Sequence, residues 1–144
     1  MRDSREPEGR ALESGSGAVH FRDLPWEQPA VNRGQLPSEL LRQAEQGGAR
    51  RKWLVRGAGG FHTSLSEFAP GFRIPPHSHD HDELLVILSG SCRIDGEERE
   101  LVADDLAVLA AGHAYGVQVG AQGLRMLTIR RAAAQAAFGS GAPR

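Results

Sequence analysis

Beyond residue 50 the chain consists mainly of short apolar or alternating runs that are separated by Gly, Pro and Asp. Alternation at every second position puts side chains on opposite faces of a strand, and frequent turn residues mark the strand ends. Asp95-Gly96 predicts a two-residue hairpin turn. The pattern predicts an all-β sandwich or barrel. The nine strand candidates are 53–56, 61–68, 74–79, 83–89, 92–94, 99–102, 106–109, 115–119 and 124–129.

The first fifty residues follow a different pattern. Residues 1–17 are rich in Arg, Glu, Gly and Ser and contain almost nothing to bury, which predicts a disordered tail. Residues 18–50 combine an extended arm with a short helix at 38–46 that begins at a Ser and ends before two glycines. We expect the arm to lay three apolar residues on the barrel, namely Phe21, Leu24 and Trp26.

The length of 144 residues matches a single domain. We place the barrel at 51–130 and a C-terminal tail at 131–144. The first part of this tail is rich in alanine and is compatible with a helix of two turns.

Composition and charge narrow the range of partners. The 17 Lys and Arg residues are balanced by 18 Asp and Glu residues, so the chain lacks the basic excess that binds nucleic acid. Its apolar runs are far shorter than the ~20 residues that span a bilayer, and its start lacks the apolar stretch of a secretory signal. The single cysteine, Cys92, excludes an intrachain disulfide and fits a reducing compartment. We expect a cytoplasmic protein that binds neither nucleic acid nor membrane.

The candidate chemistry lies in a cluster of histidines and acids. His77 and His79 are two positions apart, so on a strand both imidazoles point to the same face. Glu83 has the same parity and joins them if the strand resumes after a short bend at 80–82. Two histidines and one carboxylate with open positions are typical of non-haem Fe(II) sites and also accept Mn, Co, Ni or Zn. We therefore predict a divalent metal site and favour Fe(II).

The stretch around these residues resembles the first motif of the cupin family. That motif runs Gly, five residues, His-x-His, three or four residues, Glu, six residues, Gly. The residues at its fixed positions are Gly71, His77, His79, Glu83 and Gly90. The resemblance covers about 51–130. It implies an RmlC-like, single-domain cupin: a double-stranded β-helix (jelly-roll) barrel with a metal inside and a tendency to dimerise.

The second cupin motif departs from the family pattern. Tyr115 stands where the family has its fourth ligand, a histidine, and His113 comes two residues early with the same strand parity. Either residue is a candidate to complete the metal site or to act in catalysis. A phenol at this position can donate a hydrogen bond to the substrate or, if ionised by the cation, coordinate it. The other departures are Asp104 for Gly, Ala110 for Pro and Val119 for Asn.

Four further residues have a functional and a structural interpretation, and we favour the structural one for each. His81 falls in the expected bend, and His62 lies on a preceding strand. Cys92 fits a small buried hydrophobe better than a pocket residue. Arg73 is a candidate clamp for a substrate carboxylate, although a surface salt bridge is the commoner role of such a residue.

The strand that begins at Glu83 is apolar on both faces. Such a strand needs cover on each side, from the N-terminal arm or from a second subunit. We predict a homodimer. The residues on the face opposite Glu83 are Leu84, Val86 and Leu88.

Three functions are compatible with these observations. The first is a metal-dependent enzyme that acts on a small organic substrate in the barrel, with Fe(II) oxygenase or dioxygenase chemistry. The second is a non-redox Lewis-acid cupin of the isomerase, lyase or polyketide-cyclase type. The third is a zinc-binding sensor or regulatory domain, since Pro25-Trp26-Glu27 ahead of the barrel loosely resembles the cupin domains of anti-sigma regulators.

Overall fold

The computed structural model describes residues 9–27, 38, 42–43, 47–131 and 136–138, the last three by their backbone alone. Most of the helix expected at 38–46 therefore lies outside the described residues. The elements are the 3-10 helices η1 (Phe21–Asp23) and η2 (Ala58–Gly60) and the strands β1 (Ala49–Arg56), β2 (His62–Phe68), β3 (Arg73–His79), β4 (Glu83–Ile94), β5 (Leu101–Val102), β6 (Leu106–Leu109), β7 (Tyr115–Arg130) and β8 (Ala136–Phe138).

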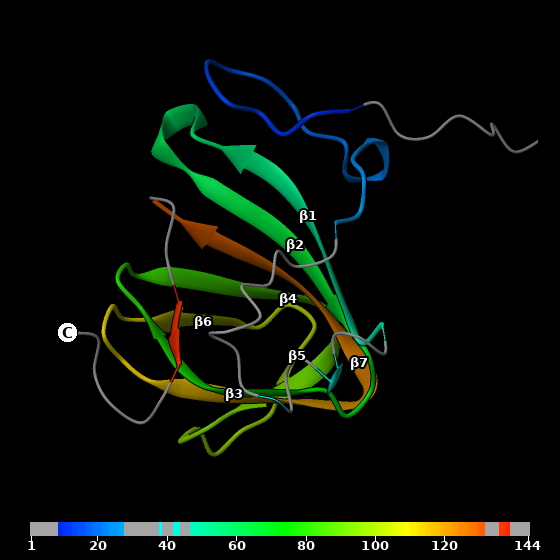
Figure 1. The fold of residues 1–144 in the computed structure, drawn as a ribbon, viewed down its shortest axis with the longest axis vertical. Helices are drawn as coiled ribbons and strands as arrows, with labels where there is room; N and C mark the ends of the chain where they lie inside the picture. Colours follow the sequence, from blue (N-terminus) through cyan, green and yellow to red (C-terminus); the bar gives the residue numbers. More distant parts are fainter. Residues whose placement is uncertain (1–8, 28–37, 39–41, 44–46, 132–135, 139–144) are drawn as a thin grey trace, which may run out of the picture.

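These strands form an antiparallel barrel in which β7 is the central strand. Residues 124–130 of β7 lie between β2 and β4, whereas residues 115–119 pair with β3 and with the end of β4. Figure 1 shows β7 turning from one wall into the other, so that the strands curve around a common interior. The predicted all-β, jelly-roll architecture is confirmed.

A pair of glycines allows β4 and β7 to bend together. Gly90 and Gly123 have φ angles of 76° and 79°, in the left-handed region that favours glycine. A Cβ on Gly90 would also collide with the carbonyl oxygen of Gly123. Two pairs of predicted strands are therefore continuous across the bend, 83–89 with 92–94 and 115–119 with 124–129.

The C-terminal segment forms a strand where we expected a helix. Residues Ala136–Phe138 pair with His77, Ser78 and His79 along the edge of β3, so the helix prediction is wrong for this stretch. Alanine favours a helix in isolation, but a free strand edge offers backbone partners that override a weak local preference. The pairing places β8 directly beside the two histidines of the cupin motif.

The N-terminal segment packs against the outside of the barrel. Leu24 is 3% exposed and forms a cluster with Leu54 of β1 and Leu65 of β2, and Phe21 and Trp26 pack against this cluster. The arm is also tied to the edge of β1 by its backbone. In the arm, Glu27 forms an antiparallel bridge with Arg51. Leu12, in the stretch 1–17 that we predict as a disordered tail, forms a parallel bridge with Val55 of the same strand.

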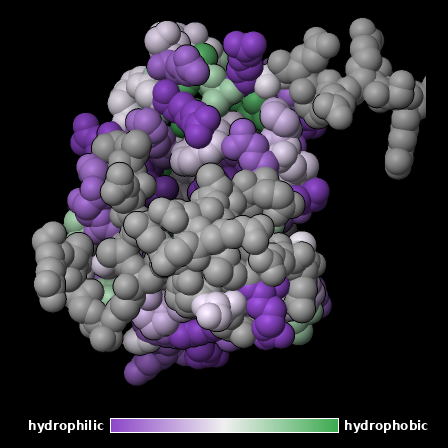
Figure 2. All heavy atoms as spheres, in the orientation of Figure 1, coloured by the Kyte–Doolittle hydropathy of each residue, from purple (hydrophilic) through white to green (hydrophobic). Residues whose placement is uncertain are grey.

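The outer face of β4 and β6 is less well covered. Leu88, Leu106 and Val108 are 37%, 54% and 65% exposed, and among the described residues the cluster that the N-terminal arm forms on the barrel includes no residue of β4 or β6. Elsewhere the surface is more polar, and Figure 2 shows hydrophilic side chains over much of the described part of one face. No helix within the described residues has the length and apolarity to cross a membrane.

Candidate functional site

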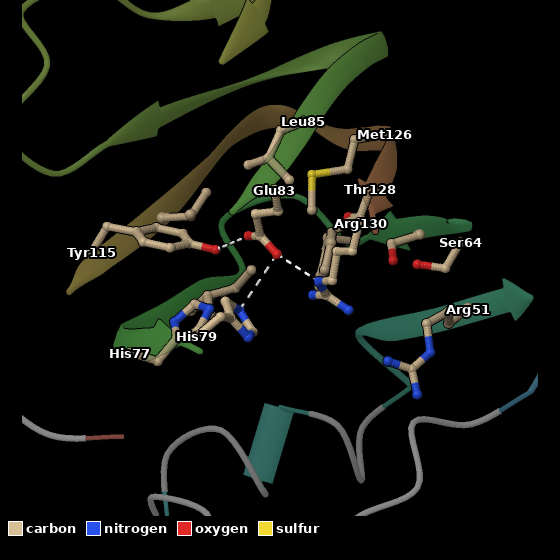
Figure 3. Close-up of a pocket in the computed structure, with 14 residues that line it drawn as sticks. Arg51, Ser64, His77, His79, Glu83, Leu85, Tyr115, Met126, Thr128 and Arg130 are labelled. Atoms are coloured by element: carbon tan, nitrogen blue, oxygen red, sulfur yellow. Dashed lines mark hydrogen bonds and ion pairs between the residues drawn. The ribbon is translucent and has the colours of Figure 1, made fainter. Parts of the chain in front are cut away.

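The barrel encloses a cavity of about 150 Å³ between β1, β2, β3, β4 and β7. Its polar lining forms two groups. In Figure 3, His77, His79 and Tyr115 lie toward one side and Arg51 and Ser64 toward the other, with Arg130 and Thr128 between them. We call the first the Glu83 cluster; it consists of His77, His79, Glu83, Tyr115 and Arg130. We call the second the Arg51 corner; it consists of Arg51, Ser64, Ser66 and Thr128.

The first three members of the Glu83 cluster come from one short stretch of sequence. His77 and His79 end β3 and are 7% and 8% exposed, and Glu83 begins β4 and is 3% exposed. The bend predicted at 80–82 joins them, and Asp82 fixes it by accepting a hydrogen bond of 2.7 Å from the backbone N–H of Ala111. As a result, His79 Nε2 lies 3.7 Å from Glu83 Oε2.

A backbone contact sets the tautomer of His77, and burial sets its charge. Its Nδ1 lies 2.9 Å from the carbonyl oxygen of Pro75. A carbonyl oxygen accepts only, so Nδ1 carries the proton and Nε2 is the acceptor of the neutral ring. Burial lowers the pKa of His77, and this outweighs the opposing effects of Pro75 and Glu83. His77 is therefore a neutral imidazole at physiological pH.

Glu83 is the centre of the cluster. The hydroxyl of Tyr115 donates a hydrogen bond to Glu83 Oε1, and the Nε–H of Arg130 donates one of 2.7 Å to Oε2. Both partners come from β7: Arg130 lies opposite Glu83 in the β4–β7 register, and Tyr115 lies opposite His77 in the β3–β7 register. A buried carboxylate is stable only with such partners, so Arg130 and Tyr115 balance its charge and its lone pairs.

The Tyr115 phenol is held in its protonated form. Burial raises its pKa, and the negative charge of Glu83 together with the hydrogen bond to it raises the pKa further. Tyr115 is therefore a hydrogen-bond donor in the cavity and not a phenolate.

The structure does not bring His113 into the cluster. It lies in an exposed turn, where its backbone N–H donates to the carbonyl oxygen of Ala110, and its side chain does not line the cavity. His113 and Tyr115 would face the same side only if both lay on one strand, but β7 begins at Tyr115, so His113 lies before the strand.

The other sequence candidates have structural contacts. His81 Nδ1 lies 2.8 Å from Asp80 Oδ1 in the bend. Arg73 makes a two-point salt bridge with Asp95, with distances of 2.9 and 2.7 Å. Cys92 is 1% exposed in the core, and burial raises the pKa of its thiol to about 11.

Comparison with known proteins agrees with this architecture. Residues 64–130 match the cupin domain family. The structure is similar to a sugar phosphate isomerase of the cupin superfamily from Silicibacter pomeroyi, with a TM-score of 0.67 at 18% identity over 86% of this chain and 82% of that one. The barrel belongs to the cupin superfamily. No curated protein sequence matches the chain.

Other cupin-like structures extend the comparison. The polyketide cyclase RemF from Streptomyces resistomycificus gives a TM-score of 0.61 at 20% identity over 90% of each chain. KdgF from Halomonas sp. gives a TM-score of 0.61 at 16% identity over 83% of this chain and 96% of that one. At these identities the similarity shows the fold alone.

The cupin resemblance implies a metal in the barrel, and the donor types suit one: two imidazoles and a carboxylate. Their arrangement does not. Among the described residues, no group of three or more His, Cys, Asp or Glu side chains is placed to hold an ion. Moreover, the guanidinium of Arg130 contacts the same carboxylate oxygen that faces His79, and Tyr115 contacts the other. As arranged, the cluster does not fit a metal ion, because a cationic side chain already neutralises Glu83.

Sequence reasoning missed the two arginines of the cavity and its hydroxyl groups. Arg130 shares the inward parity of Met126 and Thr128 on β7, which is a visible signal. Arg51 and the serines of β2 carry no motif. Only the long-range pairing of β1, β2 and β7 brings them to the cavity.

Proposed function

We propose that this cupin is an enzyme that transfers protons on a small organic substrate, in an isomerase, lyase or cyclase type of reaction without a redox step. The observation that carries the proposal is the Glu83 cluster: a protonated phenol and the neutral imidazole of His77 lie together with His79, buried, beside a cavity of about 150 Å³. Paired donors and acceptors of this kind are the requirement of general acid and base catalysis.

Each residue of the cluster has a role in such a reaction. An imidazole of His77 or His79 accepts a proton from a carbon next to a carbonyl group, and the Tyr115 hydroxyl donates a hydrogen bond to the oxygen on which negative charge develops. The imidazolium then returns the proton to a different atom of the substrate. Glu83 holds Tyr115 in place, and Arg130 fixes the position of the Glu83 carboxylate.

The similar structures support the reaction class only through the names that they carry. Two of the similar structures are named as an isomerase and a cyclase, both non-redox activities. The fold hosts many reactions, so the proposal rests on the cluster and not on these names.

Exchange of substrate hydrogen with solvent tests the proposal without knowledge of the product. Protein treated with a chelator is incubated in D₂O with a panel of small oxo and hydroxy acids and their amides, and loss of C–H signal is followed by NMR. We expect exchange in at least one compound and a decrease of about 100-fold in Tyr115→Phe. No exchange with any compound, or equal exchange in Tyr115→Phe, contradicts the proposal.

A metal-dependent enzyme with Fe(II) oxygenase chemistry is the second candidate. It is favoured by the contact between His77 Nδ1 and the Pro75 carbonyl oxygen, because metal-ligating histidines are usually oriented by such a contact. In that case Arg130 and Tyr115 would have to release the Glu83 carboxylate that they contact in this structure. His77, His79 and Glu83 would then supply the donors, and the bound metal would supply oxygen activation or, with Zn, Mn, Ni or Co, Lewis-acid chemistry. Near-stoichiometric iron after anaerobic purification, together with oxygen consumption, would support it.

The homodimer remains a prediction. The exposed aliphatic residues of β4 and β6 provide the face that such a dimer would use. Light scattering at micromolar concentration checks it, and a monomer mass contradicts it.

A further inference from the structure

The cavity contains a second arginine that the proposed reaction does not use. Arg51 lies on the inner face of β1, opposite Ser66 of β2 in the strand register. One step further, Ser64 of β2 lies opposite Thr128 of β7. The three hydroxyl residues are buried, with exposures of 3% for Ser64, 8% for Ser66 and 6% for Thr128. The Arg51 corner therefore combines one guanidinium with three hydroxyl groups.

Arg51 is held from two sides. Its backbone forms two hydrogen bonds with Glu27 of the N-terminal arm, of 2.7 and 3.0 Å. Its guanidinium carbon lies 4.7 Å from the ring centroid of Trp53. Stacking on an aromatic ring uses the flat face of a guanidinium and leaves the in-plane N–H groups available as donors.

The donors of Arg51 are not all satisfied by the part of the chain that the structure describes. Its Nε is buried and has no hydrogen-bond partner among the described residues. A buried N–H without an acceptor is unfavourable, so Arg51 sits at this position at an energetic cost that contacts among the described residues do not offset. Burial and the nearby charge of Arg130 lower the pKa of Arg51, and the opposing charge of Glu27 offsets this only in part, so an anion beside the two guanidinium groups would be attracted to them.

The charges of the cavity specify the anion. Its described lining contains two guanidinium groups, those of Arg51 and Arg130, and one carboxylate, that of Glu83, besides the two imidazoles of His77 and His79. Glu83 is paired with Arg130. Arg51 feels the charge of Glu27 from outside the cavity, but the described lining itself holds no second carboxylate to pair with it. A monoanion matches this excess, and the planar guanidinium matches the two oxygens of a carboxylate.

We propose that the Arg51 corner binds the carboxylate group of a small carboxylic acid, with Arg51 as the charged partner and the hydroxyl groups of Ser64 and Thr128 as further donors. This inference rests on the proposed function, because it names the substrate class of the same cavity. A cavity of about 150 Å³ takes a group of roughly the size of benzene, so the part of the acid that lies inside the cavity is short. Figure 3 shows Arg51 across the cavity from Tyr115, so the carboxylate lies at one end and the reacting carbon near the Glu83 cluster.

Titration calorimetry with matched acids and amides tests the subsite. The probes are short 2-oxo and 2-hydroxy monocarboxylic acids, the neutral amides of the same acids, and inorganic phosphate. We expect wild-type protein to bind at least one acid more tightly than its amide, and Arg51→Met to weaken binding of that acid by about 10- to 100-fold while leaving amide binding unchanged.

Arg56→Met is the matched control. The Arg56 guanidinium carbon lies 4.6 Å from the centroid of the same Trp53 ring, but Arg56 does not line the barrel cavity. We expect its acid binding to stay within twofold of wild type. An equal loss in both variants would assign the effect to Trp53 packing and overturn the proposal.

Three further results would decide between the subsite and the proposed reaction. If Arg51→Met does not fold, the comparison of acid with amide on wild-type protein decides, and equal binding of the two overturns the subsite. Phosphate that binds more tightly than every acid overturns the carboxylate assignment. Acid binding that depends on Arg51 but occurs without solvent exchange supports the subsite and contradicts the proposed reaction.

Discussion

The two ends of the cavity are built in different ways. In the Glu83 cluster, three of five members come from a stretch of seven residues, His77 to Glu83, in which a short bend joins two strands. The Arg51 corner takes its members from β1, β2 and β7, which meet only through long-range pairing. The first end is visible as a motif in the sequence, whereas the second depends entirely on the fold.

Arg130 shows what this difference means for function. It lies on β7, between the two ends, and pairs with the glutamate of the motif. The glutamate of a motif that suggests a metal site is thus paired with a positive side chain, Arg130, from a strand distant in the sequence. The motif alone does not specify the chemistry, because the partner of Glu83 is set by the register of β4 and β7.

Removal of the Arg130 charge is expected to have the largest effect, because it leaves the carboxylate of the Glu83 cluster without its cationic partner. In Arg130→Met the carboxylate of Glu83, whose side chain is 2% exposed, loses its cationic partner. We expect the free energy of unfolding to fall by about 3–5 kcal/mol, as for other buried ion pairs with one partner removed. Urea denaturation measures it.

The double variant Glu83→Gln/Arg130→Met is the control for this prediction. It removes the isolated charge, so we expect it to recover much of the stability. A loss below about 1 kcal/mol in the single variant would show that Arg130 is not the partner that balances Glu83.

Loss of one hydroxyl sharpens the role of the Arg51 corner. Thr128→Val keeps the shape of the side chain and removes one donor, so we expect acid binding to weaken by about 3- to 10-fold. Thr63→Val is the matched control, because Thr63 adjoins Ser64 on β2 but does not line the cavity. Calorimetry with the acid probes compares the two variants, and equal affinities would remove Thr128 from the subsite.

The smallest effect is expected at His113. Because its side chain is exposed and outside the cavity, His113→Ala should change the free energy of unfolding by less than about 0.5 kcal/mol. Solvent exchange should also be unchanged. If His113→Ala lost as much solvent exchange as Tyr115→Phe, the placement of His113 outside the site would be contradicted.

Local sequence patterns predicted much of the fold. A turn at Asp95-Gly96 is present, with a 3.0 Å hydrogen bond from the N–H of Glu97 to the carbonyl oxygen of Ile94. The connection is longer than the predicted two-residue hairpin, because β4 and β5 pair only at Ser91 with Val102 and Cys92 with Leu101. The i, i+2 pattern placed His77 and His79 on one buried face, as expected. These features depend on neighbouring residues, so a single sequence contains the information.

The features that were missed depend on contacts between distant residues. The choice between Tyr115 and His113 follows from the register of β3 against β7, which the sequence does not display. Strand β8 pairs through its backbone, which has no side-chain signature. Arg51 and Arg130 resembled ordinary surface arginines until the pairing of β1, β2, β4 and β7 turned them inward.

The most direct test of the account is the metal content of untagged protein purified without oxygen, combined with solvent exchange on the same sample before and after chelation. If Arg130 neutralises Glu83, bound metal will be well below one ion per chain, and exchange will be the same before and after chelation. Near-stoichiometric metal that survives dialysis, with exchange that is lost on its removal and restored on its return, would contradict the central claim.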